Sequence, residues 1–381
     1  MKLSRGHTQS IESLIQSLTL LAIIAFWYVS GAPSYSQTTT VTLPVFVTGG
    51  DVSELLREEQ LGAVYKDKGV PGDALRMFKM RGCKIMRLRL WVNPTDKGEM
   101  INDLPYTIAL GRRLKSDGFM LLLDLHYSDT WADPGHQSTP AAWQKLSFPE
   151  LVTQVYNYSR DVISAMRKAG AMPDIVEVGN EINSGILWPT GRDELPGGWA
   201  HLNALLKAGI AGVRKASIGT ARPQIMLHLA NGATDGLSEW FYDNLQAPSN
   251  GGPIDFDLMG FSYYPTGSNN LDDLKFSLLH TIGRYQKPII IVETAYPSGD
   301  GRLGPAQTVY AQYGISPAGQ KKFLTDLIAM VKSLPSSYGR GVIYWAPEWL
   351  NEPGLPQFYG LNPLFDSDFN AKPALDALTP N

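Results

Sequence analysis

Two glutamates, Glu181 and Glu293, each stand at the end of a short run that is typical of a buried β-strand. The first follows Asp174–Val178, and the second follows Pro288–Val292, which is apolar throughout. Continuous apolar runs of this length suit strands that are covered on both faces, as in a parallel sheet. Two carboxyl groups from different strands at one site are what cleavage of a glycosidic bond requires. For either glutamate the alternative is a structural role, as a helix cap or the partner of an arginine.

Further ionisable and aromatic residues stand near the ends of other predicted strands. Burial of many ionisable groups costs stability, so their number at the strand ends indicates a function. We expect Arg89 to keep Glu293 ionised, a tyrosine of the sixth strand to hydrogen-bond to Glu293, and Asn180 to bind a sugar hydroxyl. Glu181 would then be the proton donor, its pKa raised by apolar surroundings and by the charge of Glu293. The other strand-end residues of this kind are Arg87, Trp91, Asp124, His126, His228, Ser262, Tyr263, Tyr264, Tyr344 and Trp345.

Strand-like and helix-like segments alternate along the chain. The expected strands are Pro44–Thr48, Lys84–Trp91, Met120–His126, Asp174–Val178, Gln224–Leu229, Leu258–Tyr264, Pro288–Glu293 and Gly341–Trp345. The expected helices include Asn102–Lys115, Pro149–Lys168, Trp199–Ser217, Leu271–Tyr285 and Pro317–Leu334. Eight repeats of this alternation predict a (β/α)8 TIM barrel, in which active sites lie at the carboxyl ends of the strands. We expect one catalytic domain with long βα loops over residues 44–381; an open, doubly wound sheet is the alternative.

Composition narrows the classes of function. The 381 residues are 44% hydrophobic and carry a formal charge of −3, as in a globular protein. No basic stripe suggests a nucleic-acid partner, and no Cys/His spacing or glycine-rich loop suggests zinc or phosphate binding. The single cysteine, Cys83, lies in a strand-like run and is expected in the core; it cannot form an internal disulfide.

The N-terminus resembles an export signal. Lys2 and Arg5 precede the weakly polar to apolar stretch Leu18–Val29, and small residues follow at Ser34 and Ser36. We therefore expect residues 1–36 to be a signal peptide, 37–43 a short tail, and the protein to be secreted. An uncleaved anchor is the alternative, although 12 residues fall short of the roughly 20 that a membrane span needs.

Together, several ordered motifs resemble glycoside hydrolase family 53, the endo-β-1,4-galactanases, from about Phe46 to Trp349. An eleven-residue string at the third strand is the most specific, while the Asn-Glu pair alone indicates only the wider clan of retaining barrel glycosidases. The motifs are Arg87-Leu-Arg-Leu-Trp-Val-Asn-Pro94, Asp124-Leu-His-Tyr-Ser-Asp-Thr-Trp-Ala-Asp-Pro134, Val178-Gly-Asn-Glu-Ile182, Leu187-Trp-Pro189, Gly260-Phe-Ser-Tyr-Tyr-Pro265 and Val292-Glu-Thr-Ala-Tyr-Pro297.

The resemblance implies endo-hydrolysis of β-1,4-galactan, as in arabinogalactan or pectin side chains, with retention of configuration. It implies Glu181 as acid/base and Glu293 as nucleophile. It also implies substrate contacts from Asp129, Trp131, Asp133, Asn180, Tyr263, Tyr264 and Trp345. Ala346 departs from the family, which usually has an acidic residue there, and this leaves one subsite contact open.

Some bacterial members hold calcium in the loop after the seventh strand. Here that loop, Ser298–Ser316, has Asp300 as its sole carboxylate, so the sequence does not support calcium, and we expect no cofactor to be required. Trp131, Trp143 and Trp188 are candidates for stacking on sugar rings along an open cleft, with packing under loops as the alternative. We expect Arg89, His126, Trp188 and His228 to contribute to substrate binding, and the enzyme to act as a monomer.

Two other functions stay open at this point. One is a different retaining endo-glycanase of the same clan, acting on mannan or cellulose. The other is a carbohydrate-binding barrel without catalytic activity, against which the presence of both glutamates argues.

Overall fold

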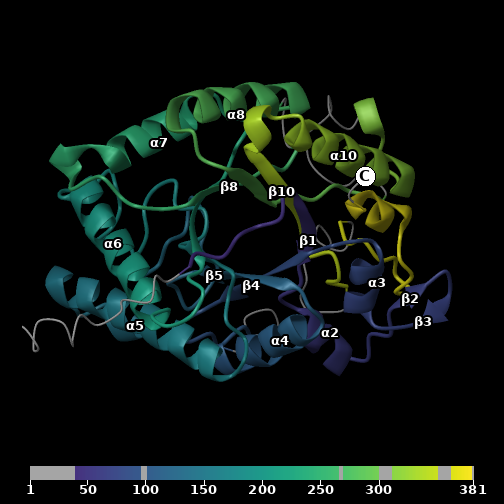
Figure 1. Cartoon of the computed structure of the whole chain (residues 1–381), viewed down its shortest axis with the longest axis horizontal. Helices are drawn as coiled ribbons and strands as arrows, with labels where there is room; N and C mark the ends of the chain where they lie inside the picture. The colour runs from purple at the N-terminus through teal and green to yellow at the C-terminus, as the bar shows by residue number, and fades with distance from the viewer. Residues whose placement is uncertain (1–38, 96–100, 266–268, 300–310, 351–361, 380–381) are drawn as a thin grey trace, which may run out of the picture. The chain divides into compact units, whose positions relative to one another are not determined.

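A computed structural model describes residues 39–95, 101–265, 269–299, 311–350 and 362–379 (Figure 1). The expected signal peptide, residues 37 and 38 of the expected tail, and Asp300 lie outside these residues. Within the described part of the chain, none of the helices combines the length and the hydrophobicity that a membrane span requires.

Eight parallel strands close into a barrel, in the order β1-β10-β9-β8-β7-β6-β5-β4. The predicted (β/α)8 fold is therefore confirmed. The strands are β1 (Val47–Asp51), β4 (Ile85–Leu90), β5 (Met120–Leu125), β6 (Ile175–Val178), β7 (Gln224–Leu229), β8 (Leu258–Ser262), β9 (Ile289–Glu293) and β10 (Gly339–Trp345). A small antiparallel pair, β2 (Lys66–Asp67) and β3 (Val70–Pro71), follows β1.

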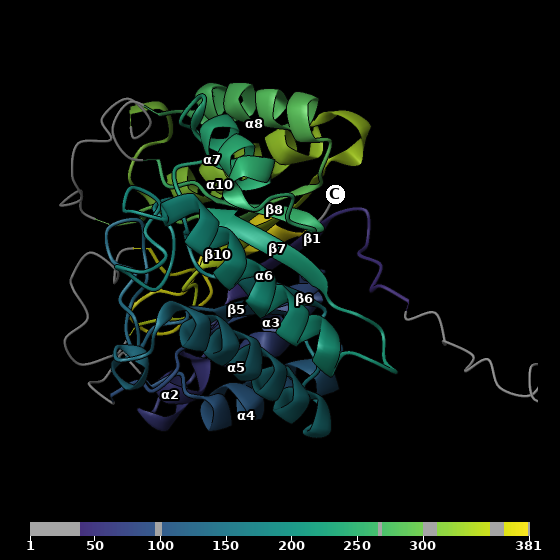
Figure 2. The same cartoon turned by 90° about the vertical axis from the view of Figure 1, so that its left-hand side faces the viewer.

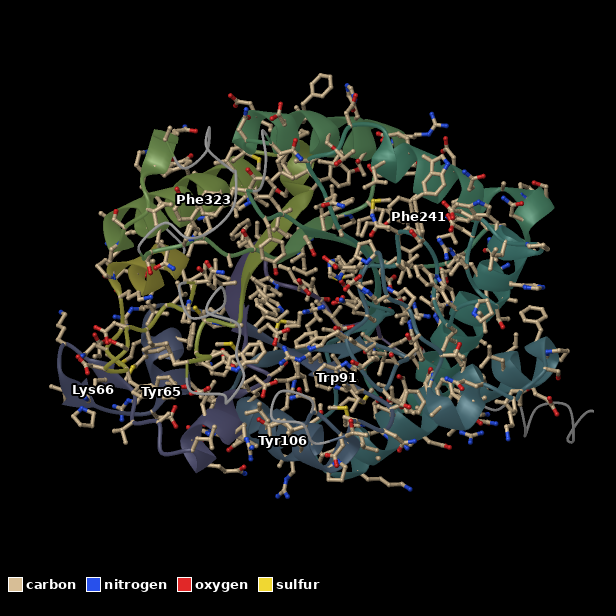
Figure 3. The ribbon with its side chains drawn as sticks, turned by 180° about the vertical axis from the view of Figure 1, so that it is seen from behind. Tyr65, Lys66, Trp91, Tyr106, Phe241 and Phe323 are labelled. Atoms are coloured by element: carbon tan, nitrogen blue, oxygen red, sulfur yellow. The ribbon has the colours of Figure 1, made fainter. Side chains whose placement is uncertain are left out.

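Helices surround the barrel, as Figures 1 and 2 show from two directions. Phe241 of α7 (Leu237–Gln246) and Phe323 of α10 (Pro317–Lys332) are fully buried in this outer layer (Figure 3). The helices are α2 (Leu55–Gln60), α3 (Ala74–Met80), α4 (Leu104–Ser116), α5 (Phe148–Lys168), α6 (Gly198–Ala216), α7 (Leu237–Gln246), α8 (Leu271–Tyr285) and α10 (Pro317–Lys332), with 3-10 turns η1 (Ala141–Trp143), η2 (Pro248–Asn250), η3 (Pro335–Ser337) and η5 (Pro373–Leu378). The sequence prediction did not include α2, α3 or α7.

The two-residue period of a strand separates the barrel interior from the helix-facing layer. In β4, Met86 and Leu88 pack in the layer under the helices, whereas Ile85 belongs to a separate apolar cluster inside the barrel. Other strands contribute to that inner cluster from equivalent positions: Val47, Leu122, Ile175, Met226, Leu258, Ile290, Val292 and Ile343. This layer forms an apolar floor. The inward positions two residues further along several strands are polar.

The first strand differs from its prediction, since it covers Val47–Asp51 rather than Pro44–Thr48. Gly49 and Gly50 lie within β1, where neighbouring residues come so close to the backbone that a side chain would not fit. A Cβ at Gly49 would lie 1.7 Å from the carbonyl oxygen of Ile85, and one at Gly50 would lie 2.7 Å from Pro347 Cγ. A pair of glycines that usually indicates a turn is therefore required here by close approach, and Asp51 becomes part of the buried interior.

Candidate active site

A strained turn after β6 carries Glu181. Gly179 has φ +91°, and Glu181 itself has φ +47°, in the left-handed region that residues other than glycine rarely adopt. The buried side chain of Gln137 holds the turn by donating a hydrogen bond to the carbonyl of Asn180 (2.8 Å). Strain of this kind persists where the surrounding structure enforces it, and it is concentrated at functional sites. The turn brings the Glu181 side chain to the wall of a cavity.

Glu293 ends β9, and both of its carboxylate oxygens have partners. Oε1 accepts a hydrogen bond from Arg87 Nη1 (2.8 Å), and Oε2 accepts one from the Tyr264 hydroxyl (2.9 Å). The expected tyrosine contact is present, but the expected arginine was wrong. Arg89 lies two residues further along β4, and its guanidinium instead pairs with Glu54 and lies 3.8 Å from Asp51.

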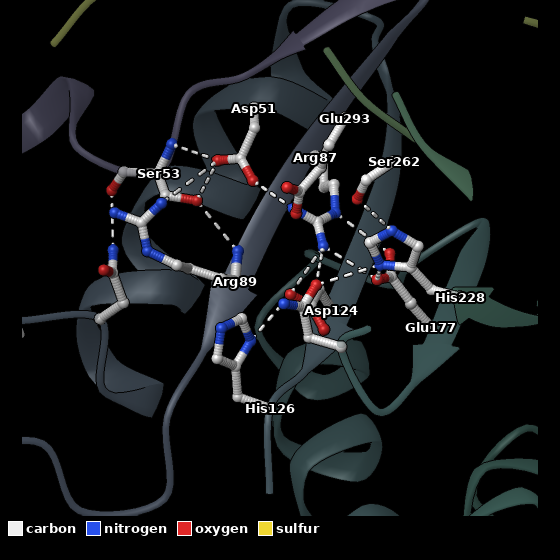
Figure 4. Close-up of polar contacts among 12 residues, drawn as sticks. Asp51, Ser53, Arg87, Arg89, Asp124, His126, Glu177, His228, Ser262 and Glu293 are labelled. Atoms are coloured by element: carbon white, nitrogen blue, oxygen red, sulfur yellow. Dashed lines mark hydrogen bonds and ion pairs between the residues drawn. The ribbon is translucent and has the colours of Figure 1, made fainter. Parts of the chain in front are cut away.

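Arg87 is the centre of a buried charge network (Figure 4). Its guanidinium donates to Asp51 (2.8 Å), Asp124 (2.9 Å), both oxygens of Glu177 (3.0 and 2.9 Å) and Glu293. One cation thus faces four carboxyl groups, of which Asp51, Asp124 and Glu177 are fully buried and Glu293 lines a cavity. Burial, together with the charge of Glu177, raises the pKa of Asp124 well above its usual range. Proton binding to Asp124 is therefore more favourable than to an aspartate in water.

The two glutamates have different electrostatic surroundings. The pKa of Glu181 is raised to about 7, mainly by burial and secondly by the negative charge of Glu293. The Ser262 hydroxyl donates a hydrogen bond to Glu181 Oε1 (2.6 Å). Glu293, by contrast, is held by a guanidinium and a phenol. At neutral pH Glu181 is therefore protonated in a large fraction of molecules, as a general acid must be, and this is the direction expected from the sequence.

A cavity of about 720 Å³ contains both glutamates, a size within the usual range for ligand sites. Asn180 borders it and donates one Nδ2 hydrogen to the carbonyl of Ala132 (2.7 Å). The predicted site residues that line the cavity are Arg89, His126, Trp131, Asp133, Asn180, Glu181, Tyr264, Glu293 and Trp345.

One wall of the cavity is aromatic. Trp131 stacks on Trp349 with ring centroids 6.2 Å apart and an angle of 22°, and Trp345 lies 6.3 Å from Trp131. The guanidinium of Arg89 lies 4.6 Å from the centre of the Trp131 ring. Arg89 therefore supports the tryptophan wall rather than Glu293.

Two predicted contact residues are turned away from the cavity. Tyr263 is 1% exposed and stacks on Phe323 in the helix-facing layer, because it alternates with its neighbour Tyr264, which faces inward. His228 is fully buried below the cavity, where its Nδ1 lies 2.6 Å from Glu177 Oε1. The expectation of direct substrate contact was wrong for these two residues.

Three more residues have structural roles in loops. Asp129 accepts hydrogen bonds from two loop amides, and Trp188 Nε1 donates to the carbonyl of Ser184 (2.8 Å). Trp143 is buried in the main core and packs edge-on against Tyr158. The cavity lining includes none of these three, so contact of these residues with the substrate stays a prediction.

Sequence reasoning missed three residues that shape the site: Gln137, Glu54 and Glu177. Glu177 is fully buried inside the barrel. The two-residue period from Ile175, an inward floor residue, would have placed Glu177 inside. No comparable periodic signal identifies Gln137 or Glu54, because both lie outside the barrel strands.

Among the described residues, no group of three or more His, Cys, Asp or Glu side chains is arranged to hold a metal ion. The loop in which calcium was considered lies partly outside those residues.

Comparisons with known proteins agree with this site. Residues 47–378 match a family model described as "Glycosyl hydrolase family 53". An arabinogalactan endo-β-1,4-galactanase of Thermothelomyces thermophilus is 36% identical over 332 residues, 86% of this chain and 97% of the relative. The structure of a fungal β-1,4-galactanase aligns with a TM-score of 0.78 and 35% identity, over 88% of this chain and 99% of that one. A family 53 catalytic domain from Ignisphaera aggregans aligns with a TM-score of 0.79 and 35% identity, over 90% and 98%.

Proposed function

The chain belongs to glycosyl hydrolase family 53, and we propose that it hydrolyses internal β-1,4-galactosidic bonds of galactan with retention of configuration. The observation that carries this proposal is the pair Glu181 and Glu293, which share one cavity but have different surroundings. The curated galactanase that matches 86% of the chain supports galactan as the substrate.

In the first step, Glu293 attacks the anomeric carbon and Glu181 donates its proton to the departing glycosidic oxygen. Arg87 and Tyr264 fix the attacking carboxylate from two directions, which limits the orientations that it samples. As the covalent bond forms, Glu293 loses its negative charge. The electrostatic cost of ionising Glu181 therefore falls in the step in which Glu181 gives up its proton.

In the second step, ionised Glu181 removes a proton from water, and the oxygen of that water attacks the anomeric carbon. The bond to Glu293 breaks, and Glu293 regains its charge within reach of Arg87. Glu181 is again protonated, so the cycle restores both carboxyl groups. Two inversions at one carbon give net retention.

Substrate binding is assigned to the residues around the cavity. The tryptophan wall offers flat apolar surface to sugar rings, and Trp131 and Trp345 are the members that line the cavity. Asn180 retains one Nδ2 hydrogen for a sugar hydroxyl near the reacting bond. Asp133 and His136, paired at 2.9 Å on the rim, are further polar groups within reach of a bound chain.

The test is hydrolysis of a polysaccharide panel containing β-1,4-galactan, mannan and a soluble cellulose derivative, followed by sizing of the products. We expect reducing ends from galactan, with a mixture of oligosaccharides early in the reaction. Preferential cleavage of mannan or cellulose would favour another endo-glycanase of the clan. Binding of galactan without cleavage would favour a carbohydrate-binding barrel.

We also propose that the protein is exported, that the mature enzyme starts near residue 37 and that it acts as a monomer without a cofactor. The charged and apolar pattern of residues 1–36 supports export. N-terminal sequencing of protein from the culture medium tests the cleavage. Light scattering tests the oligomeric state, and activity after exhaustive treatment with a chelator tests the cofactor statement.

A further inference from the structure

A chain of hydrogen bonds runs from Glu181 through the buried side chains of Ser262 and His228 to Glu177. Ser262 Oγ lies 2.6 Å from Glu181 Oε1, and His228 Nε2 lies 2.8 Å from the same Ser262 oxygen. On its other side, His228 Nδ1 lies 2.6 Å from Glu177 Oε1. Figure 4 shows the part of the chain formed by Glu177, His228 and Ser262. The residues come from β6, β7 and β8, three adjacent strands of the barrel.

The direction of each hydrogen bond follows from the groups at the ends. Arg87 donates two hydrogen bonds to Glu177 and, with His228, lowers the pKa of Glu177 to about 2 in spite of burial. Glu177 is thus ionised and can only accept, so His228 Nδ1 carries a hydrogen. At the other end, Ser262 donates to Glu181 Oε1. The oxygen of Ser262 is then free to accept from His228 Nε2, which requires a hydrogen on that nitrogen as well.

A histidine that donates through both nitrogens is an imidazolium. Glu177 raises the pKa of His228 although burial opposes this, which agrees with the charged form. The charge of His228 faces Glu177 on β6, Asp124 on β5, Glu293 on β9 and Arg87 on β4. Glu181 in turn faces Glu293, Arg87, His228 and the phenol of Tyr264.

We propose that Ser262 and His228 are positioning residues for the proposed acid/base Glu181, an inference that depends on the proposed function. The Ser262 hydroxyl occupies Oε1, so the catalytic proton lies on Oε2. His228, held by Glu177, fixes the oxygen of Ser262 and supplies a positive charge that favours ionised Glu181. That ionised form is the state produced when the proton passes to the leaving group.

This role differs from packing, because it predicts which property changes. The Ser262 hydroxyl can donate to Oε1 in both forms of Glu181, but its hydrogen bond to the ionised carboxylate is the stronger one, so loss of the hydroxyl favours the acid form. The alkaline limb of the pH–rate profile, which reports ionisation of the general acid, then moves to higher pH. A residue needed only for stability would change the melting temperature and leave that limb in place.

The test compares wild type, Ser262→Ala, His228→Gln and Ser238→Ala. Ser238 is a matched control, since it is also buried and its hydroxyl is hydrogen-bonded, to Thr281 of the neighbouring helix. For Ser262→Ala we expect the alkaline limb on galactan to rise by about one pH unit, a tenfold change in proton affinity. We expect kcat on galactan to fall about tenfold with little change in KM.

A second readout uses an aryl β-galactobioside with a dinitrophenolate leaving group. Such a leaving group departs without a proton, so Ser262→Ala should cleave it at a rate close to that of wild type. His228→Gln keeps a donor toward Ser262 but removes the charge, so its alkaline limb should also rise. It provides the same test if Ser262→Ala does not fold.

The outcomes separate this inference from the proposed function. A wild-type protein that cleaves no galactan would contradict the function itself. A wild type that cleaves galactan, with a folded Ser262→Ala or His228→Gln variant whose alkaline limb coincides with that of Ser238→Ala, would overturn the positioning role alone.

Discussion

Replacement of Glu293 by glutamine should lower the pKa of Glu181. Glu293→Gln keeps the shape of the side chain but removes the negative charge, the second largest cause of the raised Glu181 pKa after burial. Two unit charges about 5.5 Å apart, the separation of a retaining pair, interact by about 3 kcal/mol at an effective dielectric constant of about 20. That energy corresponds to about two pH units.

Water in the open cavity weakens this interaction, so we expect a fall of between about one and two pH units, from about 7 to between about 5 and 6. Burial persists in the variant and keeps the pKa above that of a free glutamate. The variant is expected to be inactive, so the assay is NMR titration of protein labelled with ¹³C at the glutamate carboxyl carbon. The signal that is absent from Glu181→Gln identifies the residue.

Glu194→Gln is the matched control, because Glu194 is exposed and pairs with Arg192 outside the cavity. It should leave the Glu181 titration unchanged. The reasoning would be refuted by a Glu181 pKa that stays near 7 in Glu293→Gln. It would also be refuted by a wild-type value near that of a free glutamate.

Three further predictions concern stability and binding. Folding raises the Glu181 pKa from 4.5 to about 7, so between these pH values the folded state binds more protons than the unfolded state. As the pH rises through this range, Glu181 therefore lowers the free energy of unfolding by up to about 3 kcal/mol. Glu181→Gln should therefore melt a few degrees above wild type at pH 8 and together with it at pH 4; equal melting at both pH values would contradict this. Arg87→Lys should lower the free energy of unfolding in a denaturant titration by about 3–5 kcal/mol, whereas Arg113→Lys in a partly exposed ion pair should cost less than about 1 kcal/mol; similar losses would refute the central role of Arg87. Trp131→Ala should raise KM for galactan about threefold to tenfold, while Trp143→Ala should lower stability and leave KM unchanged; the reverse pattern would exchange the two roles.

The barrel could be predicted because its strands are buried on both sides. The run Pro288–Val292 is apolar throughout, and the alternation of such runs with amphipathic helices leaves few alternative topologies. The first strand was predicted too early in the chain because a Gly-Gly pair normally indicates a turn. The close approach of Ile85 and Pro347 to Gly49 and Gly50 explains why glycines lie inside the strand. That approach is a tertiary contact which no local pattern records.

Within the site, the sequence predicted that the two glutamates would share a site, and the structure places both in one cavity, but it did not predict all of their partners. Arg87 and Arg89 share one side of β4, so periodicity alone gives no reason to choose between them as the partner of Glu293. The choice depends on the relative heights of β4 and β9 across the barrel, and strand pairing around the whole cylinder sets those heights.

The tyrosines show what periodicity can resolve. Tyr263 and Tyr264 are adjacent, so one must face the helices when the other faces the cavity. The two-residue period of β8, counted from the inward floor residue Leu258, places Tyr264 inside. A register shift in the pairing of β8 with β9 brings Ser262 opposite Glu293, and such a shift has no signature in the sequence.

Trapping of the covalent intermediate tests the central claim most directly. A 2-deoxy-2-fluoro-β-galactobioside with a dinitrophenolate leaving group slows the second step, so that the glycosyl-enzyme accumulates and can be digested and sequenced by mass spectrometry. We predict one added disaccharide per molecule, on the peptide that contains Glu293 and at that residue. An adduct on a different carboxyl group, or turnover of galactan with inversion and no adduct, would contradict the account.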